Sequence, residues 1–234
     1  MKKNTICFYL LAVLTLAFFN AGFGQNKDER TVGKFTGIDL GVSANLYIKQ
    51  ESPQKVVLVG DEDILEMIKT EVEGSNLRIR RKDWIFGHNK KIDIYISVPQ
   101  INELNVSGSG NIEAETPIKS NNLEMKISGS GDIIINDLKV SNVKAKISGS
   151  GNLSLDGKEI IQNFELYISG SGELKAETLT VNSYKVNVSG SGSARIKAKN
   201  EIEARISGSG KVLYYGQPKI DAEISGSGKV ASID

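Results

Sequence analysis

From Leu104 onward, apolar and polar residues alternate in short stretches that recur along the chain. In most copies, apolar residues stand five, three and one places before a Ser-Gly-Ser-Gly tetrapeptide, as Leu123, Met125 and Ile127 do. Polar residues such as Glu124 and Lys126 separate them. Alternation with a period of two predicts a strand with one buried face.

The Ser-Gly-Ser-Gly tetrapeptide occurs seven times, at steps of 21, 20, 21, 20, 18 and 18 residues. The copies begin with the pairs Ser107 and Gly108, Ser128 and Gly129, Ser148 and Gly149, Ser169 and Gly170, Ser189 and Gly190, Ser207 and Gly208, and Ser225 and Gly226. A second apolar pair follows most copies at the same phase, as Ile133 and Ile135 do. One unit is therefore a strand, a corner, a strand and a polar return. So even a period indicates stacked repeats, and we predict an all-β parallel β-solenoid of about seven rungs, with a right-handed coil favoured.

The two glycines of each tetrapeptide suit a structural corner. Stacked rungs lie about 4.8 Å apart, and a residue without Cβ adopts positive φ and permits close backbone approach at low cost. The serine hydroxyls can bond nearby backbone groups or the serines of the next rung. We therefore interpret the tetrapeptides as stacking devices, with hydroxyl ladders along the solenoid axis.

Residues 35–100 differ from the repeats and predict an N-terminal cap of the same domain. Strands are expected around Leu46 and Ile48 and at residues 56–59, and one short helix over residues 61–73. The apolar residues Ile64, Leu65, Ile68 and Val72 recur at helical spacing in that segment. Acidic residues occupy the first turn of this predicted helix, and Gly74 is at a position suited to end the helix.

The predicted solenoid spans residues 101–234. The free edge of its last strands would be covered by other residues or left open. Tyr214, Tyr215 and Pro218 are candidates for that cover. Otherwise the end is open to pairing with a second copy, because a free strand edge is a template for association.

The first residues are typical of an export signal. Lys2 and Lys3 precede an apolar run of 14 residues from Ile6 to Phe19, and small residues follow. The run is too short to span a bilayer and has signal-peptide proportions. We predict a signal peptide over residues 1–24, a flexible segment over residues 25–34, and an exported protein of the periplasm, outer surface or extracellular space. No later segment is apolar enough to span a membrane.

The charge and cysteine content exclude some classes of partner. Without Lys2 and Lys3, 27 basic residues face 28 acidic ones, and the charges are interspersed. A nucleic-acid binder normally shows a basic stripe, so no nucleic-acid partner is expected. The only cysteine, Cys7, lies in the signal, which leaves neither disulfides nor thiolate metal sites.

Motifs for cofactors, metals and catalysis are incomplete. The Gly-Ser-Gly-Lys runs at 208–211 and 226–229 lack the remaining residues of a phosphate loop. The residues after the corners include two lysines and only two acids, a poor calcium set. A single histidine, His88, supports neither a multi-histidine site nor a nucleophile pair. We therefore predict no cofactor, no metal and no catalytic residue.

One segment of the predicted cap gathers side chains suited to recognition. Trp84, Phe86 and His88 are the candidate ligand contacts, because an exposed aromatic loop binds glycan or protein. The same side chains would equally fill the core of the cap.

The corners, the export signal, the opening Phe35-Thr-Gly-Ile-Asp-Leu40 and the strand Asn45-Leu-Tyr-Ile-Lys-Gln50 together resemble the "putative auto-transporter adhesin, head GIN domain" family. Its members are secreted bacterial proteins, frequent in Bacteroidetes. The resemblance covers nearly the whole mature chain and implies an all-β, solenoid-like extracellular or periplasmic protein of unknown function.

These observations favour an exported, non-enzymatic interaction module, adhesin-like, that presents a rigid polar solenoid surface to glycan or protein. Two alternatives remain open. The first is a carbohydrate-active solenoid enzyme, a glycoside hydrolase or polysaccharide lyase, which would need paired carboxylates. Candidate acids are Asp132, Asp137, Asp156, Glu173 and Glu177. The second is a structural, self-assembling envelope protein.

Overall fold

The computed structural model describes residues 26–82 and 91–233. The predicted signal peptide over residues 1–24 and the candidate contacts Trp84, Phe86 and His88 lie outside these ranges.

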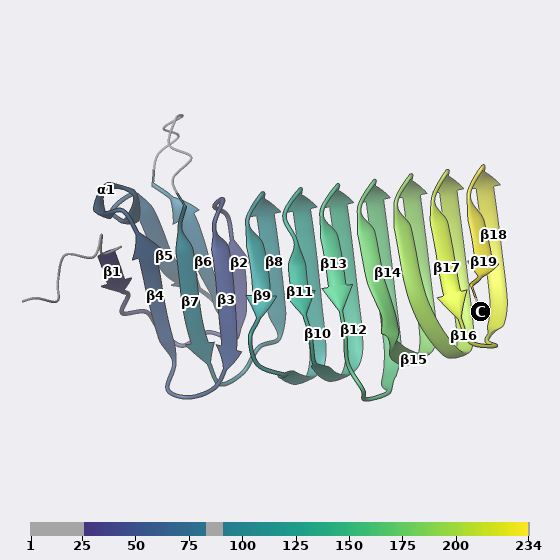
Figure 1. Ribbon diagram of the computed structural model, residues 1–234, viewed down its shortest axis with the longest axis horizontal. Helices are drawn as coiled ribbons and strands as arrows, with labels where there is room; N and C mark the ends of the chain where they lie inside the picture. Colours follow the sequence, from purple (N-terminus) through teal and green to yellow (C-terminus); the bar gives the residue numbers. More distant parts are fainter. Residues whose placement is uncertain (1–25, 83–90, 234) are drawn as a thin grey trace, which may run out of the picture.

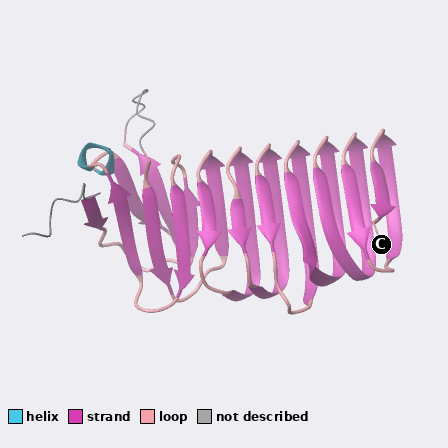
Figure 2. Cartoon of the chain, in the orientation of Figure 1, coloured by secondary structure: helices cyan, strands magenta, loops and turns pink. Residues whose placement is uncertain are grey.

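The described chain is nearly all strand, with one short helix at the N-terminal end (Figure 2). Each corner joins a strand that enters it to a strand that leaves it. The entering strands are β8 (Glu103–Gly108), β10 (Ile118–Gly129), β12 (Leu138–Gly149), β14 (Ile161–Gly170) and β18 (Lys219–Gly226). The leaving strands are β9 (Asn111–Ala114), β11 (Ile133–Ile135), β13 (Asn152–Leu155), β17 (Lys211–Tyr215) and β19 (Lys229–Ser232). The long strands β15 (Glu173–Gly190) and β16 (Ser193–Gly208) leave one corner and enter the next.

Successive rungs pair in parallel and in register, which confirms the predicted parallel β-solenoid. In the entering strands, Ser128 pairs with Ser107 on one side and with Ser148 on the other. In the leaving strands, Ile133 pairs with Ile112 and with Leu153. We call the layer of entering strands sheet one and the layer of leaving strands sheet two. Figure 1 shows the rungs side by side along the long axis, from β8 and β9 to β18 and β19.

The core lies between the two sheets and consists of the predicted inward positions. In the rung of β14, Phe164, Leu166 and Ile168 are buried, and the same holds for the corresponding triplets of β10, β12, β15 and β16. The polar residues that alternate with them point outward, as period-two patterning requires. Burial of one face therefore fixes which side chains are available to a partner.

The corners stack closely because their glycines have no side chains. The first glycine of each corner has positive φ, which is +118° at Gly170. A Cβ on Gly170 would lie 2.5 Å from the carbonyl oxygen of Gly149 in the preceding rung, and one on Gly172 would lie 2.6 Å from that of Gly151. Both positions therefore require glycine, the first for conformation and space and the second for space.

Backbone groups, rather than hydroxyls, form the ladder at the corners. The N–H of Ser171 donates to the carbonyl oxygen of Gly149 at 2.8 Å, and Ser191 donates to Gly170 at 2.9 Å in the same way. The expected hydroxyl ladder differs from this arrangement: no hydrogen bond joins one corner hydroxyl to the next within residues 26–82 and 91–233. Residues in register are one strand spacing apart, about 4.8 Å, which is too far for a direct hydroxyl bond.

The N-terminal region contributes further rungs. The strands β2 (Gly37–Leu40) and β3 (Asn45–Gln50) pair in parallel with β8 and β9, and on their other side with β6 (Asn76–Arg81) and β7 (Asp93–Val98). Residues 41–44, Gly-Val-Ser-Ala, thus stand in register with the corner at 107–110. Strands β2 and β3 are thus inserted between a rung formed later in the sequence, β6 and β7, and the repeats.

Three antiparallel strands cover the N-terminal end of the solenoid. Strand β4 (Lys55–Gly60) pairs with β7, and β5 (Ile68–Glu73) pairs with β6. Strand β1 (Asn26–Glu29) pairs with β4, so residues 26–29 are ordered as a strand, unlike the flexible segment expected over 25–34. The free edge of β4 supplies the hydrogen bonds that order this segment.

The predicted helix over residues 61–73 is correct in place but wrong in length. Helix α1 spans only Glu62–Leu65, with Glu62 and Asp63 in its first turn. Ile68 and Val72 lie in β5 instead. Residues four apart share a face of a helix and also a face of a strand, so this pair does not distinguish the two. Gly74, with φ of +64°, begins the two-residue turn between β5 and β6 rather than ending a helix.

The C-terminal rung is open in the described residues. Strand β18 is exposed along its whole length, and its inward-pattern residues Ile220 and Ile224 are 39% and 41% exposed. Tyr214 and Tyr215 do not cover it, because they belong to β17.

A polar cluster ties the inserted strand β2 to its neighbours. Asn76, Gly37 and Glu103 are in register on three adjacent strands. Because Gly37 has no side chain, Asn76 reaches across it and donates to Glu103 at 3.0 Å. Asn105 and Lys126 also donate to Glu103, at 2.9 and 3.0 Å. Burial raises the pKa of the Glu103 carboxyl, but the hydrogen bonds from Asn105, Asn76 and Lys126 outweigh burial and lower it to about 2.

We expect Gly170→Ala to destabilise the solenoid more than Gly108→Ala. Both glycines have positive φ, but a Cβ on Gly108 meets nothing within 4 Å. Gly108→Ala should therefore cost about 1–2 kcal/mol of backbone strain, and Gly170→Ala on the order of 3–4 kcal/mol because the clash adds to the strain. Urea unfolding measures both. Equal losses would show that the close stacking of corners is unimportant.

Replacing Glu103 should make stability less dependent on pH. A folded-state pKa of about 2 lies below the ordinary value of about 4.3 for an unfolded chain. The stabilisation by Glu103 is therefore complete above that value and is lost as pH falls toward 2. We expect Glu103→Gln to lower the free energy of unfolding by about 1–2 kcal/mol at pH 7, with the difference vanishing near pH 2. Glu165→Gln, at the same position of another rung, is the control, and an equal effect there would contradict this prediction.

Tyr184→Phe should stabilise the protein. The hydroxyl of Tyr184 is buried in the core without a hydrogen-bond partner, and the ring packs against Phe164 with centroids 5.2 Å apart. Removing an unsatisfied buried hydroxyl should raise the free energy of unfolding by about 1 kcal/mol. Thermal unfolding of Tyr184→Phe beside the exposed-face control Tyr167→Phe measures this. A loss of stability would instead indicate a partner such as a buried water.

Candidate functional site

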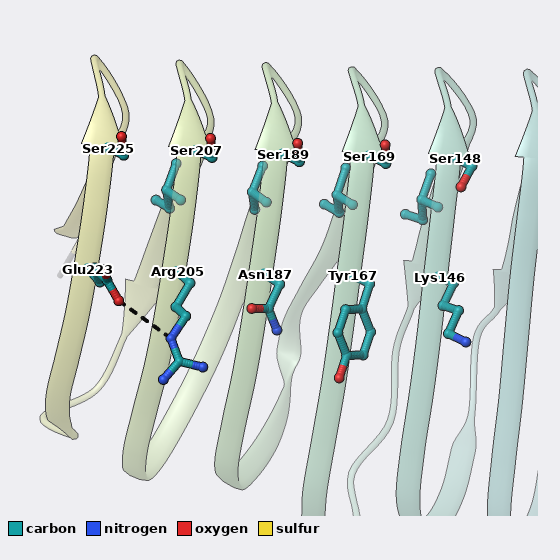
Figure 3. A pocket seen from close by; sticks show the side chains of 14 residues that line it. Lys146, Ser148, Tyr167, Ser169, Asn187, Ser189, Arg205, Ser207, Glu223 and Ser225 are labelled. Carbon is teal, nitrogen blue, oxygen red and sulfur yellow. Dashed lines mark ion pairs between the residues drawn. The ribbon is translucent and has the colours of Figure 1, made fainter.

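A groove on the outer face of sheet one is the main candidate site. It has a volume of about 450 Å³ and crosses five consecutive rungs at the strands that enter the corners. Two parallel rows of outward side chains line it (Figure 3), together with the nearly buried apolar side chains Ile147, Ile168, Val188 and Ile206. One row is Lys146, Tyr167, Asn187, Arg205 and Glu223, and the other is Ser148, Ser169, Ser189, Ser207 and Ser225.

The repeat explains why these residues form rows. One row consists of the first serines of five corners, and the other consists of the residues two places before them; the register between rungs is unbroken at both positions. Side chains at equivalent positions therefore recur about every 4.8 Å along the axis. The serines contribute hydroxyls at all five rungs of the groove, while the residues of the other row differ from rung to rung.

The charges in the groove are concentrated at its two ends. Arg205 lies between Glu203, at 2.8 Å, and Glu223, at 3.6 Å, and its pair with Glu223 links β16 to β18 (Figure 3). Lys146, at the other end, makes no ion pair with any residue that the structure describes. Tyr167 stands between them with a half-buried ring. The groove thus combines an aromatic face, a cation without an ion pair among the described residues, one row of serine hydroxyls and the single amide of Asn187.

This arrangement is better suited to binding than to hydrolysis. Among the described residues that line the groove, Glu223 has the only carboxylate, and it is paired with Arg205. A glycosidase needs two carboxylates across the scissile bond. Three of the acids considered from the sequence do not line the groove and have partners elsewhere: Asp132 accepts from Asn152, Asp137 pairs with Lys139, and Asp156 accepts from Thr178.

The residues after the corners form a hydrogen-bonded ladder on sheet two. Asn111 donates to Asn45 at 3.4 Å, and Asn152 donates to Asp132 at 2.9 Å. The backbone N–H of Asp132 in turn donates to the side-chain oxygen of Asn111 at 3.2 Å. Within residues 26–82 and 91–233, no three or more histidine, cysteine or acidic side chains gather in a way that could hold a metal ion. The side-chain amides here bond to one another along the axis.

Sheet two carries a second feature, which the sequence reasoning missed. Tyr47 of β3 and Tyr95 of β7 are in register, and their rings stack with centroids 5.2 Å apart and an angle of 20° between the planes. Tyr95 is 42% exposed. The outward phase of both residues was visible in the sequence, but their adjacency depends on pairing between strands 48 residues apart.

The sequence-predicted residues are distributed as follows. The candidate contacts Trp84, Phe86 and His88 lie outside the described residues. The corner serines and glycines lie along one edge of the solenoid, where both serines of each corner are exposed. Only the first serines of five corners border the groove. In the described part of the chain, no helix is long and apolar enough to cross a membrane.

Comparison with known proteins gives one family and several similar folds. The model of the family described as "putative auto-transporter adhesin, head GIN domain" matches residues 34–218. A putative adhesin from Bacteroides fragilis has a TM-score of 0.85 and 25% identity, with 91% of this chain and 98% of that chain covered. A putative lipid binding protein from Parabacteroides distasonis, at 25% identity and the same coverage, has a TM-score of 0.74. A putative adhesin from Parabacteroides merdae, at 22% identity and the same coverage, shares the fold with a TM-score of 0.70. A search of curated proteins finds no match.

Proposed function

We propose that this chain, which belongs to the "putative auto-transporter adhesin, head GIN domain" family, is an exported, non-enzymatic interaction module of the cell surface or envelope. It holds an extended ligand, a glycan or a protein segment, along the groove of sheet one. The observation that carries this proposal is the groove itself, which presents two rows of side chains over five rungs.

The geometry of the groove favours a linear polymer over a compact ligand. A chain laid along the solenoid axis meets a new rung about every 4.8 Å, which is close to the length of one sugar ring in a linear glycan. Each rung offers a serine hydroxyl, so consecutive units of a repeating polymer find the same contact. Successive residues of a peptide carry different side chains and do not match the spacing of the rungs, so they would not repeat the same contact. A glycan is therefore the favoured ligand.

The individual side chains have distinct roles in this proposal. The Tyr167 ring offers its face to the apolar side of a sugar ring, since aromatic residues combine a large contact area with a polar tip. Asn187 donates to and accepts from hydroxyls. Lys146, with its charge unpaired among the described residues, attracts a carboxylate or sulfate on the polymer.

Rigidity supports the display of such a ligand. The close packing of corners and the in-register strands fix the positions of the lining residues before binding. This lowers the entropic cost of ordering them when a ligand binds. The exported location is part of the proposal. It is supported by the apolar segment near the start of the chain and by the adhesin description of the family and of similar solved structures.

We expect Tyr167→Ala to weaken binding to a matching polysaccharide by about tenfold, since loss of one aromatic stacking contact is worth about 1.4 kcal/mol. A polysaccharide array followed by titration calorimetry measures this. Tyr215→Ala is the matched control, because Tyr215 points outward from sheet two and is remote from the groove.

The same polysaccharides should be incubated with the protein and assayed for cleavage. The proposal requires binding without new reducing ends and without unsaturated products. Release of either would identify a hydrolase or lyase. Equal loss of binding in the Tyr167→Ala and Tyr215→Ala variants would show that the groove is not the binding site.

A further inference from the structure

The stacked tyrosines of sheet two border a small pocket that the groove does not include. The pocket has a volume of about 120 Å³ and is lined by residues of β3, β4 and β7 together with Glu51 and Glu115. We call it the tyrosine pocket, and its principal residues are Tyr47, Tyr95, Val57, Ser97, Glu51 and Lys55. It lies on the layer of strands that leave the corners, near the N-terminal end (Figure 1).

A short side chain beside a tyrosine creates the hollow. Tyr95 is in register with Val57 on β4, and Val57 is in register with Glu29 on β1. Valine is much shorter than its two neighbours, so the outer face of the Tyr95 ring is left open on that side. The Tyr47 ring stacks on the inner face and holds Tyr95 upright.

Polar groups surround this aromatic face. Ser97 donates to Glu51 at 2.8 Å, Lys55 pairs with Glu29 at 2.8 Å, and Lys49 pairs with Glu115 at 3.6 Å. These pairs are exposed and therefore contribute little to stability. They can exchange partners with the hydroxyls of a ligand at low cost. Two lysines and two glutamates line the pocket, so it has no net charge.

The tyrosine hydroxyls add neutral donors. Burial, and to a smaller extent the charge of Asp93, raises the pKa of Tyr47 and of Tyr95 above the ordinary value. Both hydroxyls therefore remain protonated at neutral pH and can donate a hydrogen bond.

We propose that the tyrosine pocket is a second binding site, which takes one neutral pyranose residue at the end of a glycan. An aromatic face for the apolar side of the ring, polar groups around its rim, balanced charge and a volume too small for more than one ring together match this class of ligand. The groove fits a polymer that passes along the axis, whereas the tyrosine pocket fits a terminal unit. One chain then contacts a glycan surface on both of its broad faces, and linked contacts strengthen attachment.

The proposal predicts saturable binding of a small neutral sugar. A panel of neutral methyl pyranosides, with a uronic acid and an amino sugar as charged comparisons, is titrated against the full chain. Binding is followed by NMR of the tyrosine ring signals. At least one neutral pyranoside should shift the Tyr47 and Tyr95 signals, with weaker effects from the charged sugars.

Variants locate the site. Tyr95→Ala should weaken binding of that pyranoside roughly tenfold, whereas Tyr95→Trp, with a larger ring, should preserve it. Val57→Phe fills the hollow and should abolish binding while the tyrosine stack remains. Tyr167→Ala, in the groove, should leave it unchanged, which separates this proposal from the one for the groove.

Three results would overturn the proposal. One is that no neutral pyranoside shifts the tyrosine signals. The second is that only charged sugars do so. The third is that Val57→Phe and Tyr95→Ala bind the sugar as the parent chain does.

Discussion

The close stacking of glycine on glycine at the corners is the constraint on which the rest of the structure depends. The carbonyl oxygen of Gly149 accepts the N–H of Ser171 and also occupies the space that a Cβ on Gly170 would need. This contact sets the register of each rung against the next. Once the register is set, the inward triplets of successive rungs stack on one another to form the core, and the outward residues align in rows.

The rows of outward side chains give the repeat its candidate binding surfaces. Since the inward positions are nearly invariant in character and the corners demand glycine, variation along the chain is confined to outward side chains. The groove of sheet one and the tyrosine pocket of sheet two both consist of such side chains, held in place by the same scaffold. The two sites differ because one follows the axis over the regular rungs, while the other uses the irregular N-terminal end, where the short Val57 lies beside Tyr95.

Most of the solenoid could be predicted from the sequence because its signals are local. Apolar triplets such as Phe164, Leu166 and Ile168 indicate a strand, and the Ser-Gly-Ser-Gly tetrapeptide indicates a corner. The N-terminal rungs were harder, because the corner at 41–44 keeps only one glycine and its neighbours in space come from distant parts of the chain. The helix was overextended because the spacing of Ile68 and Val72 fits two periods. The tyrosine pair follows from long-range pairing, which no local pattern reveals.

Amide hydrogen exchange at the corners tests the central claim most directly. If stacked corners set the register, the N–H groups of Ser150, Ser171 and Ser191 should exchange only when the solenoid unfolds as a whole, with the same free energy as the buried strands beside them. Exchange of these three amides by local opening, at free energies far below that of the neighbouring strands, would contradict the account. In that case the strands would hold the corners in place, and not the reverse.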